Sequence, residues 1–242
     1  SLGAALLIMG STLFSHWFIF EVINDVSLAV ASSIGSFLVL LAVITVASRI
    51  KDTMALLIIG LMFGSITAAL VSVLSYFTDA DKLQQYIFWA FGSVGYLSGV
   101  QLVLLSVFIL LGIFLSVISV KSLNALLLGE NYARSLGVHL KKTRFIIIIA
   151  TGLLAGAVTA FAGPIAFIGL AVPHLTRQIF NTTDHKILVP AVLVYGAILL
   201  LLCDLIAQLP SSSYVLPLNA ITSVVGAPVV IWLLVRKKKM IF

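Results

Sequence analysis

The sequence predicts an all-α, polytopic membrane protein. Of its 242 residues, 62% are hydrophobic and only 9% are charged, whereas soluble domains carry roughly 25% charged residues. The apolar residues fall into windows of about 20, the length at which a helix crosses the hydrocarbon core of a bilayer. Because backbone groups in lipid have no water to bond, these windows are expected to be helices. Membrane topology also explains the net charge of +6 better than nucleic-acid binding does.

Eight spans are expected, although hydropathy alone leaves one of them undecided. That segment, residues 163–180, contains Pro164 and Pro173, so that it could also be a loop. The first span is incomplete. In chain order the expected spans cover residues 1–18, 27–48, 54–77, 99–120, 145–162, 163–180, 187–209 and 215–235.

The distribution of basic residues indicates whether residues 163–180 cross the membrane. If residues 163–180 cross the membrane, thirteen of the fourteen lysine and arginine residues lie on one side, and only Lys82 lies opposite. If they do not cross, seven lie on each side. Since cytoplasmic loops carry an excess of basic residues, we expect the crossing, with the C-terminal tail in the cytoplasm.

Two further features concern the outer side and the packing of the helices. Residues 78–98 carry an aromatic cluster that suits a helix at the membrane interface, either as an aromatic belt or as a cap over a pathway. Gly60 and Gly64 are spaced four apart, so they share one helix face and predict close packing there.

Side chains that could support catalysis or ion coupling are scarce. Asp204 is the only acidic residue within an expected span, and Pro210 follows it closely, so local pairing near the outer end is favoured over an ion relay. His174 has no ligand-type neighbour at i+3 or i+4. The chain also lacks a GxxxxGK[ST] phosphate loop and a convincing pairing of a nucleophile with a base. We expect no enzyme activity, no directly bound cofactor and no metal site.

A polar and basic interruption, residues 124–144 with the sequence NALLLGENYARSLGVHLKKTR, divides the chain near its middle. Gly129 and Gly137 are expected to bound two short helices, and Glu130 and Arg134 are spaced for an i, i+4 pair in the second. Exposed leucines are unusual in an interhelical loop, so this segment is expected to be a docking surface. Its expected apolar side chains are Leu126, Leu127, Leu128, Ala133 and Leu136.

Four ordered blocks carry a family resemblance. They are FWAFGS at residues 88–93, LGENYARSLGV at 128–138, GPIAFIGLAVPHLTR at 163–177 and LPLNAITSVVGAP at 216–228. In order and spacing they resemble the permease subunits of ABC importers for iron-siderophore complexes, haem and cobalamin, and the second block looks like the coupling helix of that family. Family members have ten spans. The resemblance therefore implies a single permease domain over 1–242 that lacks its first two helices, with a coupling loop at 124–144.

The resemblance implies the following function and partners. The chain would be a bacterial inner-membrane permease subunit, paired with a second permease subunit, two cytosolic ATP-binding subunits that hold ATP and Mg²⁺, and an extracytoplasmic substrate-binding protein. The residues implied to couple to the ATPase are Leu128, Gly129, Glu130, Ala133, Arg134, Ser135 and Gly137. Those implied to lie by the translocation path or its gate are Phe88, Trp89, Gly92, Ser93, Gly163 and Pro164.

The chain departs from the family pattern in one place. Where members commonly read E-L-P-x-G, residues 215–219 read VLPLN, so that an acidic residue and a glycine are replaced by Val215 and Asn219. The cargo and the choice between homodimer and heterodimer stay open. An alternative function is an ion-coupled secondary transporter of a small solute, which would need an ionisable site at the membrane midplane.

Overall fold

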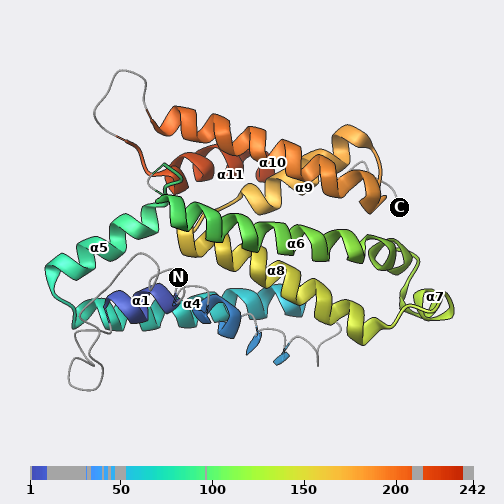
Figure 1. The fold of residues 1–242 in the computed structure, drawn as a ribbon, viewed down its shortest axis with the longest axis horizontal. Helices are drawn as coiled ribbons and strands as arrows, with labels where there is room; N and C mark the ends of the chain where they lie inside the picture. The colour runs from blue at the N-terminus through green and yellow to red at the C-terminus, as the bar shows by residue number, and fades with distance from the viewer. Residues whose placement is uncertain are drawn as a thin grey trace. The chain divides into compact units, whose positions relative to one another are not determined.

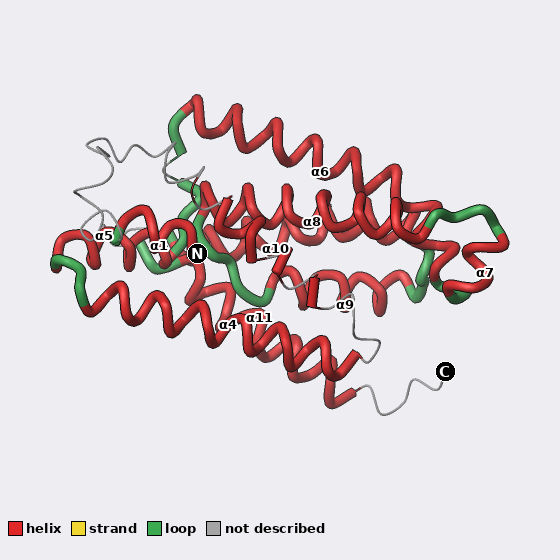
Figure 2. Tube along the Cα trace, turned by 90° about the horizontal axis from the view of Figure 1, so that it is seen from below, coloured by secondary structure: helices red, strands yellow, loops and turns green. Residues whose placement is uncertain are grey.

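The computed structural model describes residues 2–9, 31, 34–39, 41–42, 45–46, 53–95, 97–208 and 215–236, and the regular elements in these ranges are all helices (Figures 1 and 2). The all-α class predicted from composition is therefore confirmed. The helices are α1 (Leu2–Ile8), α4 (Thr53–Tyr76), α5 (Ala80–Phe91), α6 (Gly99–Leu126), α7 (Glu130–Ser135), α8 (Leu140–Ala162), α9 (Ile168–Phe180), α10 (His185–Ala207) and α11 (Leu218–Arg236).

Four of these helices, α4, α6, α8 and α10, are long and apolar enough to cross a membrane, and α11 contains a shorter apolar stretch, Leu218–Trp232. Four of the expected spans are thus confirmed as helices of sufficient length, and α11 lies at the position of a fifth. Two bounds differ by five residues or more: α6 continues six residues past residue 120, and α8 begins five residues before residue 145. The spans expected at 1–18 and 27–48 lie largely outside the described residues.

The segment that hydropathy left undecided runs along the whole of α10. Ile165 packs against the cluster that contains Cys203 and Ala207 near the end of α10. Val172 lies beside Gly196, and Asp184 directly precedes the first residue of α10. The 23 residues of α10 rise about 34 Å, while the 13 residues of α9 rise only about 20 Å. Residues 163–167, which precede α9, are not helical. A membrane crossing by this segment, which the charge distribution favours, stays a prediction.

Two compact units make up the chain. The first comprises Ser1–Ala90, Gly95–Ile109 and Thr151–Pro164, and the second comprises Phe91–Val94, Leu110–Ala150 and Ile165–Phe242. In the second unit α9, α10 and α11 pack against one another (Figure 1).

Small side chains set the packing of the first unit. Ala5, Ile8 and Met9 are fully buried against α4 and α5. A Cβ atom on Gly3 would overlap the carbonyl oxygen of Ala31, and one on Gly35 would overlap the backbone nitrogen of Gly3. α1 therefore crosses the helical residues near 35 at a distance that only glycine permits.

Candidate functional site

The interruption between α6 and α8 folds into one short helix, α7, held between two glycines. We call residues 127–139 the docking turn. Gly129 has φ 98° and ψ 154° and precedes α7, a backbone conformation essentially restricted to glycine. After α7, Gly137 has φ 82°. Its N–H donates to the carbonyl of Arg134 at 2.9 Å, and the N–H of Val138 donates to that of Ala133 at 3.0 Å. This is a Schellman motif, which closes the carbonyl end of the helix.

Two expectations about this segment were wrong. The first of the two short helices does not exist, because α6 continues through Leu126 and only a turn separates it from Gly129. The carboxylate of Glu130 pairs with the guanidinium of Arg144 in α8 and not with Arg134. The Schellman turn brings the chain back, so that Arg144 in α8 lies beside Glu130 at the start of α7.

The docking turn exposes apolar side chains. Three of them, Leu128, Tyr132 and Leu136, are spaced four apart and are 55–64% exposed. Leu127 beside them is half exposed. Ala133 differs from the expectation, because it is fully buried and supports the turn from inside. Of the other implied coupling residues, Arg134 is exposed, and the Ser135 hydroxyl donates to the carbonyl of Asn131 at 3.2 Å.

The FWAFGS block forms the end of α5 and the turn after it. The 12-residue helix confirms that this segment is helical. Phe88 is 61% exposed, whereas the indole N–H of Trp89 is buried and has no acceptor among the described residues. Trp89 lies beside Tyr86, with ring centroids 5.9 Å apart, and burial raises the pKa of the Tyr86 phenol. Gly92, with φ 72°, ends the helix before Ser93.

The GPIAF block breaks the chain between α8 and α9. Gly163, with φ 76°, directly follows α8, and Pro164 comes next. Phe167 has φ 64° and ψ −32°, and the N–H of Ile168 donates to the carbonyl of Ala166 at 2.8 Å. This bond makes a γ-turn centred on Phe167, a strained conformation for a residue with a side chain. The Oδ1 atom of Asn219 accepts the N–H of Ala166 at 3.2 Å. The residue that departs from the family pattern therefore holds this turn.

Two of the four blocks, and the residue that follows a third, meet in the second unit. Cys203, Ala207 and Leu218 form a buried cluster, and Val94 and Ile165 pack against it. Val94 directly follows the FWAFGS block, Ile165 belongs to the GPIAF block, and Leu218 belongs to the block at 216–228. Chain neighbours of the implied path residues thus share one core, although the structure gives no contact among the path side chains themselves.

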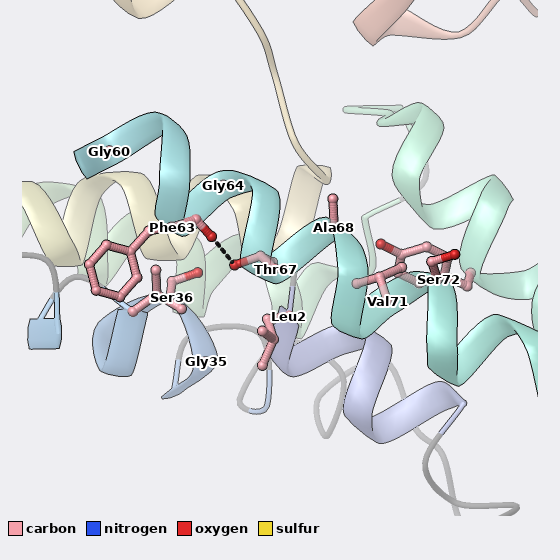
Figure 3. A pocket seen from close by; sticks show the side chains of 12 residues that line it. Leu2, Gly35, Ser36, Gly60, Phe63, Gly64, Thr67, Ala68, Val71 and Ser72 are labelled. Carbon is pink, nitrogen blue, oxygen red and sulfur yellow. Dashed lines mark hydrogen bonds between the residues drawn. The ribbon is translucent and has the colours of Figure 1, made fainter. Parts of the chain in front are cut away.

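A separate cavity of about 750 Å³ lies along α4 in the first unit (Figure 3). Gly60 and Gly64 line it, and a Cβ atom on either would meet nothing within 4 Å, so the close packing predicted from their spacing is not formed by the described residues. Thr67 also lines it, but its hydroxyl donates to the carbonyl of Phe63 at 2.9 Å. Among the described residues, none of the implied path positions lines this cavity.

Asp204 is paired locally, as its position predicts. The Nε2 atom of Gln208, one turn further along the chain, donates to its carboxylate at 2.7 Å. Within the described part of the chain, no three His, Cys, Asp or Glu side chains group to hold a metal ion.

A polar contact between α6 and the start of α10 was not predicted from the sequence. The side chain of Asn124, near the end of α6, bonds to Asp184 and His185 at the start of α10. Asp184 before His185 has the pattern of a helix N-cap, which the sequence shows. Its partner Asn124 is 60 residues away, so no local pattern could reveal the pairing.

The fold and the docking turn define the class: an all-helical, multi-span membrane protein with the ABC permease fold. A solved structure of an ABC transporter assigned to the metal-chelate type, in an inward-facing conformation, matches with a TM-score of 0.79 and 28% identity, over 97% of this chain and 73% of that one. The chain belongs to the FecCD transport family, whose model matches residues 1–236.

Two relatives share the name vitamin B12 import system permease protein BtuC. The one from Vibrio cholerae serotype O1 is 38% identical over 214 residues, which covers 88% of this chain and 64% of the relative. The one from Salmonella typhi is 37% identical over 213 residues, covering 88% and 65%. The chain thus spans slightly less than two thirds of the length of these relatives.

Proposed function

We propose that this chain is the membrane-spanning permease subunit of an ABC importer and has no catalytic role itself. ATP would be hydrolysed, with Mg²⁺, on partner chains. Family membership and the names of the relatives support the proposal. The observation that carries it is the docking turn.

A group of exposed apolar side chains on one small turn marks a surface that contacts another protein. The docking turn presents four such side chains, and its backbone is fixed by two glycines with positive φ and by the Schellman bonds. A rigid protrusion of this kind passes on the movement of a partner without absorbing it. The partner we propose is a cytosolic ATP-binding subunit, contacted by the implied coupling residues other than the buried Ala133.

The proposed mechanism is alternating access. Closure of the ATP-binding subunits would push the docking turn, and the spans of two permease subunits would reorient around a path between them. The path would be lined near the FWAFGS and GPIAF blocks. An extracytoplasmic binding protein would deliver the cargo, and the relatives' names favour a cobalamin over an iron-siderophore complex or haem.

The proposed location is the inner membrane of a bacterium, with the docking turn and the C-terminus in the cytoplasm. The grouping of lysine and arginine on one side of the expected spans supports this orientation.

The decisive experiment changes the docking turn without disturbing its fold. Replacing Leu128 and Tyr132 together by aspartate is expected to abolish co-purification of the ATP-binding subunits and uptake of cyanocobalamin into proteoliposomes. Because both side chains are exposed, the melting temperature of the permease should stay nearly unchanged. Asn131→Ala, on the same helix, is the matched control and should retain both properties. Full association of the double variant would contradict the proposal.

The same vesicles test the rival mechanism. Uptake that follows a proton or sodium gradient and ignores ATP would establish a secondary transporter instead.

A further inference from the structure

A single side chain, that of Asn124, joins the helix that leads into the docking turn to the start of α10. Its Nδ2 atom donates to Oδ1 of Asp184 at 2.6 Å. Its Oδ1 atom accepts the backbone N–H of His185 at 2.9 Å and lies 2.7 Å from Nδ1 of the same residue. The nitrogen and the oxygen of the Asn124 amide therefore both form hydrogen bonds, to the consecutive residues Asp184 and His185.

The charge of Asp184 fixes the orientation of this amide. A carboxylate accepts hydrogen bonds and donates none, so the nitrogen of Asn124 must face it. The oxygen of Asn124 then faces His185, and Nδ1 of the imidazole must carry the hydrogen. The side chains of Asn124, Asp184 and His185 can therefore form these hydrogen bonds in one arrangement only. Such a defined arrangement is what a residue that positions one helix against another requires.

Asp184 has a second role, because it is the N-cap of α10. Its Oδ1 atom also accepts the backbone N–H of Lys186 at 2.9 Å, and its own N–H donates to the hydroxyl of Thr182 at 3.2 Å. The bond from Asn124 thus reaches the first turn of α10 directly. α10 in turn packs on α9 and α11.

Asn124 is five residues before Gly129, which directly precedes α7. A displacement of the docking turn moves the end of α6 first, and Asn124 is the side chain there that bonds to α10. The link is short and charge-assisted, which makes it stiffer than a contact between apolar side chains.

We propose that Asn124 is a positioning residue that carries the movement of the docking turn to α10, and through it to α9 and α11. The inference rests on the proposed function, because it concerns how the ATP-driven movement reaches the membrane-spanning helices. A purely structural tie would contribute to stability alone, whereas a positioning residue sets how much cargo is moved for each ATP hydrolysed.

The test exchanges the two partners. Asn124→Asp places two carboxylates against each other and breaks the link. Adding Asp184→Asn restores it in reverse: asparagine caps a helix as well as aspartate, and a turn of its amide lets Oδ1 keep the N–H of Lys186 while Nδ2 donates to the new carboxylate at position 124. In that double variant the same carboxylate still accepts both bonds from His185. Asn124→Ala removes the link without adding charge.

The assembled importer in proteoliposomes gives three readouts: co-purification of the ATP-binding subunits, ATP hydrolysis and uptake of radiolabelled cyanocobalamin, with a ferric siderophore complex and haem as separate probes. We expect both single variants to keep the subunits bound and hydrolysing while uptake per ATP falls by roughly tenfold, within the usual range of coupling between sites. The exchanged double variant should recover most of the loss.

Each outcome decides between the two proposals. Normal uptake per ATP in Asn124→Ala, or no recovery in the exchanged variant, would overturn the role of Asn124 while leaving the permease function intact. Absence of ATP-dependent uptake of every probe by the unaltered protein would overturn both.

Discussion

The Cβ atom of Phe167 lies 2.5 Å from the position that a Cβ atom on residue 226 would occupy. Phe167 is held there by the γ-turn that begins α9, and Gly226 belongs to α11. The strained turn and α11 therefore fit together only because residue 226 has no side chain.

Replacing Gly226 by alanine is expected to lower the free energy of unfolding by about 1–3 kcal/mol, the usual cost of an added methyl group in a filled space. The blocking atom is next to the backbone, so it cannot rotate away. Thermal unfolding in detergent measures the effect. The matched control is Gly169→Ala in α9, where nothing lies within 4 Å, and which should be neutral or stabilising. Equal melting of both variants would contradict the close contact.

A second glycine contact gives an independent prediction. Gly3→Ala places a methyl group on the carbonyl of Ala31 and should disrupt the crossing of α1 with the residues near 35. The yield of folded protein, measured by size-exclusion chromatography, is expected to fall sharply. Gly64→Ala in α4 is the control, because its surroundings are open. A well-behaved Gly3→Ala variant would show that α1 can move away from this crossing.

These glycines show what the sequence could and could not predict. The spacing of Gly60 and Gly64 predicted close helix packing. Such spacing identifies a helix face made of small residues, but it does not identify the helix that packs against that face. The contact instead forms between Gly3 and Gly35, which share no helix. Hydropathy predicted the five described spans well, because the thickness of a bilayer sets their length. The docking turn could be predicted because its two glycines are a local sequence signal. Its ion pair with Arg144 could not, because that pair depends on the direction in which the turn leads the chain.

The docking turn depends on the backbone of Gly129. Any side chain there is strained by about 1–3 kcal/mol, since φ 98° with ψ 154° is a region for glycine alone. Gly129→Ala is therefore expected to weaken co-purification of the ATP-binding subunits, while the melting temperature of the spans changes little. Gly99→Ala, also in open space but without a positive φ, should bind normally. Normal binding by Gly129→Ala would show that the turn need not be rigid.

The ion pair between Glu130 and Arg144 is expected to add little stability. Both side chains are more than half exposed, and exposed pairs contribute about 0.2–1 kcal/mol. A double-mutant cycle with Glu130→Gln and Arg144→Gln, measured by thermal unfolding, should give a coupling energy in that range that shrinks at high salt. The same cycle with Arg134→Gln should give a value near zero. A larger coupling to Arg134 would contradict the observed pairing.

Acid is expected to weaken the start of α10 through Asp184. The backbone N–H of Lys186, and secondly the side chain of Asn124, hold the pKa of this carboxyl below its usual value. The folded state therefore binds the proton less readily than the unfolded state, in which aspartate titrates near a pH of about 3.9. The stabilisation is complete above that pH and is lost as the pH falls through the lower pKa of the folded state.

Asp184→Asn isolates this effect, because asparagine keeps the cap but does not titrate. The melting temperature of the unaltered protein should exceed that of the variant near neutral pH, since a charged acceptor makes the stronger bonds. The difference should shrink as the pH falls below about 3.9, the usual pKa of aspartate, toward the lower pKa of the folded state. A difference that stays constant over this range would mean that the bonds to Lys186 and Asn124 do not depend on the charge of Asp184.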